Sequence, residues 1–210
     1  MKVLVVANDS QKEELSQGAT NEELHIEWVS DPGSFTGSFH FDACLDLLFE
    51  NSRERIQLLL QLQAPLVIIN SVVIPLTEVQ EDFIRISGWN TFLKRPAIEA
   101  ACNNELLKEK AERIFSGLGK KTEWVPDIPG LVTARVVASV INEAYFALEE
   151  KVSSKEEINT AMKLGTNYPY GPFEWTEKIG PGNIHTLLKR LAEEQKRYEP
   201  AALLTQEAFG

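Results

Sequence analysis

Short apolar runs separated by amphipathic segments mark the first half of the chain. The runs lie at residues 2–7, 24–29, 43–49, 65–69 and 83–87, and helical periodicity is present at 11–17 and 52–62. A continuous apolar run such as KVLVVA is typical of a strand buried on both faces of a parallel sheet. Strands that alternate with helices predict an α/β fold, here a Rossmann-like parallel sheet with a loop at residues 31–40.

After Lys94-Arg95-Pro96 the pattern becomes helical. We predict an amphipathic helix at 105–118, ended by Gly119, and a last strand at 123–125. A long apolar helix at 131–150 is followed by a helix that starts after Ser153-Ser154, and by two more at 182–195 and 201–208. Pro129-Gly130 interrupts the pattern, so we place a first domain at residues 1–127 and a helical domain at 128–210.

The helix at 131–150 carries apolar residues, Val136 and Ile141 among them, around most of its circumference. A helix of this kind has to be covered on more than one side. A small domain has difficulty burying it alone, so we predict a homodimer formed through the helical domain. The alternative is that the helices at 182–195 and 201–208 cover it within one chain.

Residues 161–175, AMKLGTNYPYGPFEW, form the most distinctive stretch and are closed by Ile179-Gly180. Gly165 is predicted to end one helix, because glycine tolerates the left-handed conformation found there. Pro172 is predicted to begin the next helix, where a proline loses no hydrogen bond. From periodicity alone this is a corner between two helices.

Charge and cysteine content narrow the choice of partners. The net charge of −10 argues against nucleic acid or an anionic membrane surface as partner. It also disfavours an anionic ligand such as coenzyme A, unless basic residues cluster locally. Two cysteines provide no disulfide framework, no apolar run is long enough to span a membrane, and the chain begins directly with a strand rather than a signal peptide. We therefore expect a cytoplasmic protein.

The stretch at 161–180, together with Pro129-Gly130, resembles the C-terminal domain of the 3-hydroxyacyl-CoA dehydrogenases, including the 3-hydroxybutyryl-CoA dehydrogenases. The resemblance implies a Rossmann-like domain followed by an all-α domain like the C-terminal domain of 6-phosphogluconate dehydrogenase. It also implies dimerisation through that domain, NAD as cofactor, and hydride transfer to or from a 3-hydroxyacyl-CoA of fatty-acid metabolism. The chain resembles a diverged and truncated member.

The cofactor motif of that family is degenerate in this chain. The glycine positions of G-x-G-x-x-G hold Ala7, Asp9 and Lys12. A carboxylate at Asp9 is expected to cap the following helix and to repel the phosphates that would bind there. We therefore predict that no NAD is bound. Residues 42–51 resemble the family's strand and turn beside the nicotinamide ring, with Glu50 at the acidic position; a strand end with a helix cap is the alternative.

The catalytic positions are only partly retained. Glu99 matches the family's glutamate, and Asn90 matches its asparagine, but the histidine base twelve residues before the glutamate is replaced by Ser87. A serine hydroxyl does not titrate near neutral pH and cannot replace an imidazole.

In the turn after the fourth strand, Asn70 is retained, Ser71 follows, and Val72 takes the place of the catalytic serine. The resemblance therefore leaves Glu99, Ser87 and Asn90 as catalytic candidates, and Glu50, Asn70 and Ser71 as cofactor-binding candidates. His25, His40 and His185 have no metal-ligand spacing and are predicted to be surface or loop residues.

Three functions stay open on the sequence. The favoured one is a non-catalytic homologue that binds an acyl-CoA-like small molecule or a partner protein. The second is a working oxidoreductase with altered residues, and the third is a structural subunit that pairs with an active paralogue.

Overall fold

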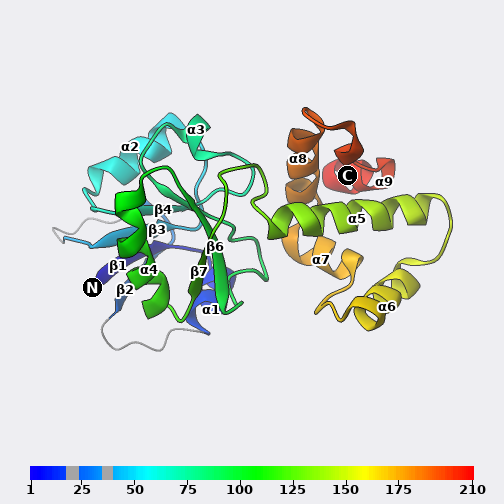
Figure 1. Ribbon diagram of the computed structural model, residues 1–210, viewed down its shortest axis with the longest axis horizontal. Helices are drawn as coiled ribbons and strands as arrows, with labels where there is room; N and C mark the ends of the chain where they lie inside the picture. The colour runs from blue at the N-terminus through cyan, green and yellow to red at the C-terminus, as the bar shows by residue number, and fades with distance from the viewer. Residues whose placement is uncertain (18–23, 35–39) are drawn as a thin grey trace. The chain divides into compact units, whose positions relative to one another are not determined.

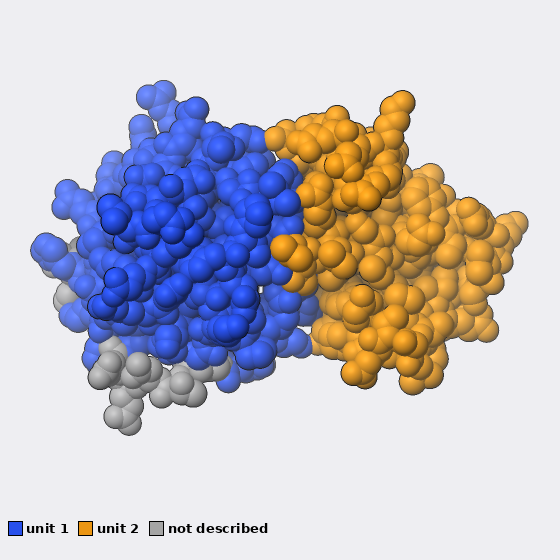
Figure 2. Space-filling model, in the orientation of Figure 1, with its two compact units in different colours: residues 1–131 blue, residues 132–210 orange. Residues whose placement is uncertain are grey.

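The computed structural model describes residues 1–17, 24–34 and 40–210, and the predicted loop at 31–40 therefore falls partly outside the described residues. The chain forms two compact units, residues 1–131 and residues 132–210 (Figure 2). We call them the N-terminal domain and the helical domain, and each is described by itself.

The N-terminal domain contains a seven-stranded sheet with the order β2-β1-β3-β4-β5-β6-β7 (Figure 1). Every neighbouring pair is parallel except β5 and β6. The strands are β1 Lys2–Val6, β2 His25–Val29, β3 Ala43–Asp46, β4 Val67–Asn70, β5 Ile84–Ile86, β6 Ala97–Cys102 and β7 Lys121–Trp124. The predicted α/β class and Rossmann-like architecture are confirmed, with a mostly parallel sheet.

Helices cover both faces of this sheet, because alternate strand residues feed two separate cores. On one face, Val3 and Val5 of β1 pack in a cluster with Phe115. On the other face, Leu4 and Val6 pack in a cluster with residues of α2 and α3. The helical elements of the domain are α1 Asp9–Ser16, η1 Pro32–Ser34, α2 Arg53–Gln61, α3 Leu76–Val79, η2 Glu105–Leu107 and α4 Lys108–Gly117. This double burial is the reason that β1 reads as an unbroken apolar run.

Strand β6 corrects the sequence interpretation, which treated the chain after residue 96 as helical. Ala97–Cys102 is rich in alanine and has few residues with strand preference. It becomes a strand because it pairs on both sides, antiparallel with β5 and parallel with β7. Pairing between distant segments therefore outweighs the weak local preference.

The helical domain consists of five α-helices and one short 3-10 helix among its described residues. They are α5 Thr133–Glu149, α6 Lys155–Thr166, α7 Pro172–Ile179, α8 Pro181–Ala192, η3 Lys196–Tyr198 and α9 Ala202–Phe209. The predicted helix start at Pro172 is confirmed, and Ser154 is the N-cap of α6. In the described part of the chain, no helix is both long enough and apolar enough to span a membrane.

Three details of the helical domain differ from the sequence expectations. The helix α6 runs through Gly165 and ends at Thr166; its C-cap Asn167 adopts the left-handed conformation (φ 56°), which asparagine also tolerates. Val136 is 51% exposed and is not part of the buried spine. His185 is 7% exposed, because it lies on the inner face of α8 beside the ring of Phe209.

Candidate functional site

The carboxyl ends of the parallel strands bring the candidate residues to one edge of the sheet. Strands β1, β3, β4 and β5 run in the same direction. The carboxyl ends of these strands therefore share one edge of the sheet, and the residues at or just beyond these ends include Asn8, Leu47, Ser71 and Ser87. In open α/β sheets this edge is where ligands bind.

Side chains of the turn between β1 and α1 form hydrogen bonds with the backbone of the same turn. Asn8 is the N-cap, and its Oδ1 accepts a hydrogen bond of 2.9 Å from the backbone N–H of Gln11. In return, Oε1 of Gln11 accepts a hydrogen bond of 3.1 Å from the backbone N–H of Asn8. The capping residue is thus Asn8 and not Asp9, because the helix begins at Asp9. One of the N–H groups that could bind a phosphate is satisfied internally.

A chain of amide hydrogen bonds extends from this turn along the edge. Nε2 of Gln11 donates to the carbonyl oxygen of Leu47 at 2.9 Å, and Nδ2 of Asn70 donates to the same oxygen at 3.1 Å. Oδ1 of Asn70 accepts from the backbone N–H of Gly88 at 2.8 Å. We call Gln11, Leu47, Asn70 and Gly88 the edge network. It joins the ends of β1, β3, β4 and β5.

Gly88 permits the close approach of Asn70 in the edge network. A Cβ atom at Gly88 would lie 3.0 Å from both Cγ and Oδ1 of the Asn70 side chain. Such a distance is shorter than an ordinary van der Waals contact, so a larger residue would displace the amide. The side chain of Asn70, a cofactor-binding candidate, is used to hold β4 against its neighbours.

A buried ion pair lies beside the edge network. Asp46 at the end of β3 is fully buried, and Arg55 of α2 donates to both of its carboxylate oxygens at 2.7 and 2.8 Å. Burial raises the pKa of Asp46, whereas the Arg55 guanidinium opposes this shift. Arg55 also binds Asp31, just after β2, at 3.2 Å. The sequence did not reveal these contacts, in which the guanidinium of Arg55 binds the carboxylates of both Asp46 and Asp31.

The remaining cofactor-binding candidates do not converge on a ligand site. Glu50 is exposed, and its backbone oxygen accepts a hydrogen bond from Ser52 at the start of α2. Ser71 is 7% exposed, and its Oγ donates to the carbonyl oxygen of Ile74 at 2.8 Å.

Cys44 is a buried thiol whose pKa is raised to about 12 by burial, so it does not serve as a nucleophile.

The catalytic candidates Ser87 and Glu99 lie opposite each other across β5 and β6. The backbone N–H of Ser87 donates to the carbonyl oxygen of Glu99 at 3.4 Å. Ser87 is 1% exposed, and its Oγ has no hydrogen-bond partner among the described residues. Glu99 is half-buried and interacts electrostatically with Arg95, and Asn90 is exposed. The carboxylate thus has Arg95 as an electrostatic neighbour, and the position where the resemblance places an imidazole holds Ser87.

Arg85 is a structural residue that sequence reasoning missed. Its side chain is fully buried on β5 and donates to the carbonyl oxygens of Ser71, Val72 and Ile128. It also pairs with Asp127 at 2.6 Å, while the other oxygen of Asp127 accepts from the N–H of Leu76. In the sequence, its role is indicated only by the position of a charged residue between two apolar residues, Ile84 and Ile86. Arg85 fixes the turn that carries Ser71 and Val72.

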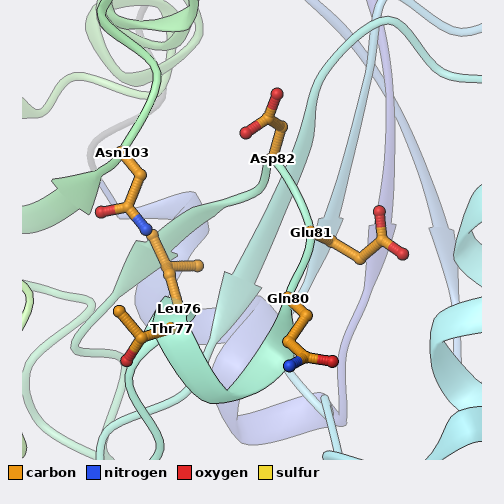
Figure 3. A pocket seen from close by; sticks show the side chains of 6 residues that line it. All are labelled: Leu76, Thr77, Gln80, Glu81, Asp82 and Asn103. Atoms are coloured by element: carbon orange, nitrogen blue, oxygen red, sulfur yellow. The ribbon is translucent and has the colours of Figure 1, made fainter.

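One pocket of the N-terminal domain lies away from this edge. It has a volume of about 400 Å³ and is lined by Leu76, Thr77, Gln80, Glu81, Asp82 and Asn103. Asp82 precedes β5 and Asn103 follows the antiparallel β6, which places the pocket at the opposite edge of the sheet. Figure 3 shows the carboxylates of Glu81 and Asp82 pointing in different directions. Within the described residues, no group of His, Cys, Asp and Glu side chains has metal-binding geometry.

The comparisons with known proteins agree with this architecture. Residues 130–208 match the family model of the 3-hydroxyacyl-CoA dehydrogenase C-terminal domain. The chain is 41% identical to 3-hydroxyadipyl-CoA dehydrogenase of Escherichia coli over 112 residues, which are 52% of this chain and 24% of that protein. It is 31% identical to a 3-hydroxybutyryl-CoA dehydrogenase of Bradyrhizobium diazoefficiens over 135 residues, 62% of this chain and 46% of that protein.

Among solved structures, (S)-3-hydroxybutyryl-CoA dehydrogenase from Ralstonia eutropha superposes with a TM-score of 0.75. The superposition covers 98% of this chain and 92% of that chain at 22% identity, which shows a shared fold. The fold is thus a Rossmann-like domain followed by a helical domain of the 3-hydroxyacyl-CoA dehydrogenase type. The chain is thus similar to the 3-hydroxyacyl-CoA dehydrogenases, and its matches span less than half the length of these two curated relatives.

Proposed function

We propose that this chain is a non-catalytic homologue that binds a partner or an acyl-type ligand without NAD. The observation that carries the proposal is the pair of hydrogen bonds between Asn8 and Gln11, continued to Leu47. A dinucleotide needs free N–H groups at this helix start and close approach of its pyrophosphate to the backbone. The side chain of Gln11 crosses that position, and Asp9 adds a repelling charge. The residues present do not fit the cofactor.

The catalytic candidates support the same proposal. The position of the family's histidine holds Ser87, whose hydroxyl has no hydrogen-bond partner in the described part of the chain. Loss of a positioned general base reduces the rate by about 10²–10⁴-fold. Glu99, which would orient the base, has Arg95 as an electrostatic neighbour instead. We therefore infer that Ser87 does not accept a proton from a substrate hydroxyl as the histidine of the family would.

We further propose that the helical domain forms a homodimer, or pairs with an active paralogue. The exposed apolar side chains of Val132 and Val136, 48% and 51% exposed, are one turn apart at the start of α5. The family match covers this region. Light scattering should show a dimer, and Val136→Glu should shift it toward monomer. A monomer at high protein concentration would contradict the homodimer and leave only pairing with a paralogue.

Thermal shift measurements test the ligand assignment. NAD and NADH should not stabilise the protein, since a ligand that binds only the folded state must raise its melting temperature. Acetoacetyl-CoA and free CoA, run side by side, separate recognition of the acyl group from recognition of the nucleotide. Stabilisation by acetoacetyl-CoA alone would support an acyl-type ligand. Stabilisation by NADH would overturn the proposal in favour of a working oxidoreductase.

A further inference from the structure

Helix α6 contrasts with the other long helices of the helical domain in how it is held. None of the twelve residues of α6, all of which the structure describes, is buried. The helices α5, α7 and α8 each bury five or more residues. The apolar residues Ile158 and Met162 of α6 are only half-buried, and Leu164 is 82% exposed. Hydrophobic burial therefore contributes little to holding α6 in place.

Three polar contacts join α6 to the rest of its domain. Near its start, Nζ of Lys155 binds Oε1 of Glu207 on α9 at 2.5 Å. In its middle, Oδ1 of Asn159 accepts a hydrogen bond of 2.9 Å from the backbone N–H of Phe173. Near its end, Nζ of Lys163 binds Oε1 of Glu174 on α7 at 2.5 Å. Each contact lies about one helical turn from the next.

The contact at Asn159 depends on a glycine. A Cβ atom at Gly171 would lie 2.3 Å from Oδ1 and 2.5 Å from Cβ of Asn159. Gly171 has φ −74°, which any residue adopts, so its small size is what the position requires. The start of α7 therefore has a recess that admits Asn159, and a single methyl group would fill it.

Lys155 also covers an aromatic surface. Its ammonium group lies 5.2 Å from the ring centre of Phe173 and 5.7 Å from that of Tyr145. The two rings are in edge contact with each other, and the Tyr145 hydroxyl donates to Glu207 at 2.5 Å. These four residues line a cavity of about 660 Å³ in the helical domain. Lys155 is thus the cation above an aromatic and carboxylate site.

The ends of α6 are suited to movement of the helix as a unit. Lys151 before it and Asn167 after it both have left-handed backbone conformations, with φ of 58° and 56°. The helix also carries its own cap, because Ser154 and Glu157 exchange hydrogen bonds at its start. A detached helix of twelve residues is nevertheless only marginally stable in water, so loss of the three contacts should let its amides exchange faster.

We propose that α6 is a detachable lid of the helical domain, held by Lys155, Asn159 and Lys163, and that it covers the Tyr145–Phe173 cavity through Lys155, the α6 residue that lines it. The side chains of both ion pairs are 33–39% exposed. Salt screens charged contacts of this kind, and each contributes up to about a fivefold change in an opening equilibrium. Release of α6 removes the Lys155 ammonium from the two rings and opens the cavity.

Hydrogen exchange of the intact protein tests the lid. Amides of residues 155–166 should exchange faster than those of α5 in about 0.01 M salt. In about 1 M salt, where the Debye length is only about 3 Å, exchange in α6 should rise severalfold while α5 stays unchanged. Equal protection of α6 and α5 at both salt concentrations would overturn the proposal.

Two pairs of variants test which contacts protect the amides of α6 from exchange. Gly171→Ala should abolish protection in α6 alone, whereas Gly182→Ala, whose new Cβ would meet nothing closer than 3.9 Å, should not. Lys155→Met should accelerate exchange in α6 and reduce its salt dependence, while the remaining Lys163–Glu174 pair keeps part of it. Lys196→Met, at an exposed lysine of the same domain, should change neither. If Gly171→Ala lowers protection in α5 and α8 as much as in α6, then α6 unfolds only with the whole domain and is not a lid.

Discussion

Replacing Arg85 by methionine is expected to destabilise the N-terminal domain severely. The methionine keeps an unbranched apolar side chain in the core but removes the guanidinium, which is fully buried. The carbonyl oxygen of Ser71 then loses its charged donor, and Asp127 keeps only the N–H of Leu76. Burial lowers the pKa of Arg85, and Asp127 opposes this shift. The guanidinium stays charged, and Asp127 offsets part of the cost of burying it.

The size of the effect follows from the burial of the two partners. Removing one member of a buried ion pair costs about 3–5 kcal/mol, because an uncompensated charge is left behind. The side chain of Asp127 is 11% exposed and retains one hydrogen bond, so we expect about 3 kcal/mol for Arg85→Met. Asp127→Asn added to Arg85→Met should recover part of this loss, because it removes the stranded charge.

Urea unfolding in a Trp175→Phe background measures this effect, since the other three tryptophans lie in the N-terminal domain. Arg113→Met is the matched control. Arg113 pairs with Glu109 on the surface of α4, where the side chains are 67% and 78% exposed, and its loss should cost less than about 0.5 kcal/mol. A loss below about 1 kcal/mol for Arg85→Met would refute the reasoning.

Further predictions concern the edge network, the catalytic position and the helical domain. Gln11→Ala removes two hydrogen bonds and should cost about 1–2 kcal/mol in urea unfolding; an unchanged midpoint would contradict the role of the edge network. Ser87→His combined with Val72→Ser should show no NADH oxidation with acetoacetyl-CoA, and detectable turnover would show that a cofactor site survives. Burial, and then Lys189, lowers the pKa of His185 below its ordinary value of 6.5. The unfolded chain therefore binds the proton first, and stability should fall as the pH drops below about 6.5. His185→Gln should reduce this fall; an identical pH profile would refute it.

The elements that could be predicted are those with a strong local signal. The run at residues 2–7 gave β1 because both of its faces are buried, and Pro172 gave the start of α7 because its fixed φ suits that position. Strand β6 was missed because its alanines favour no strand, and pairing with β5 and β7 decides its conformation. In α6, Asn167 replaced the predicted stop at Gly165, since both residues tolerate the left-handed region.

The site contacts that escaped prediction join residues far apart in the chain. Gln11 and Leu47 are separated by 36 positions, and Arg85 and Asp127 by 42. The sequence indicated a helix cap at Asp9, but it did not show that Gln11 would reach the residue that follows β3. The carboxylate of Asp9 drew attention because of its charge, whereas the amide of Asn8 made the cap. The sequence therefore predicted a helix cap at this turn, but not the hydrogen bonds that Asn8 and Gln11 make there.

The proposed function depends most directly on the prediction that no dinucleotide binds at the β1–α1 turn. Isothermal titration calorimetry with NADH, and with ADP-ribose to isolate the pyrophosphate and adenosine, measures it on the intact chain. Asn8→Gly combined with Gln11→Ala frees the N–H of Gln11 and serves as the comparison variant. We predict no saturable heat for the unaltered protein with either ligand at micromolar concentrations. Saturable micromolar binding of NADH by the unaltered protein would contradict the account and restore the oxidoreductase assignment.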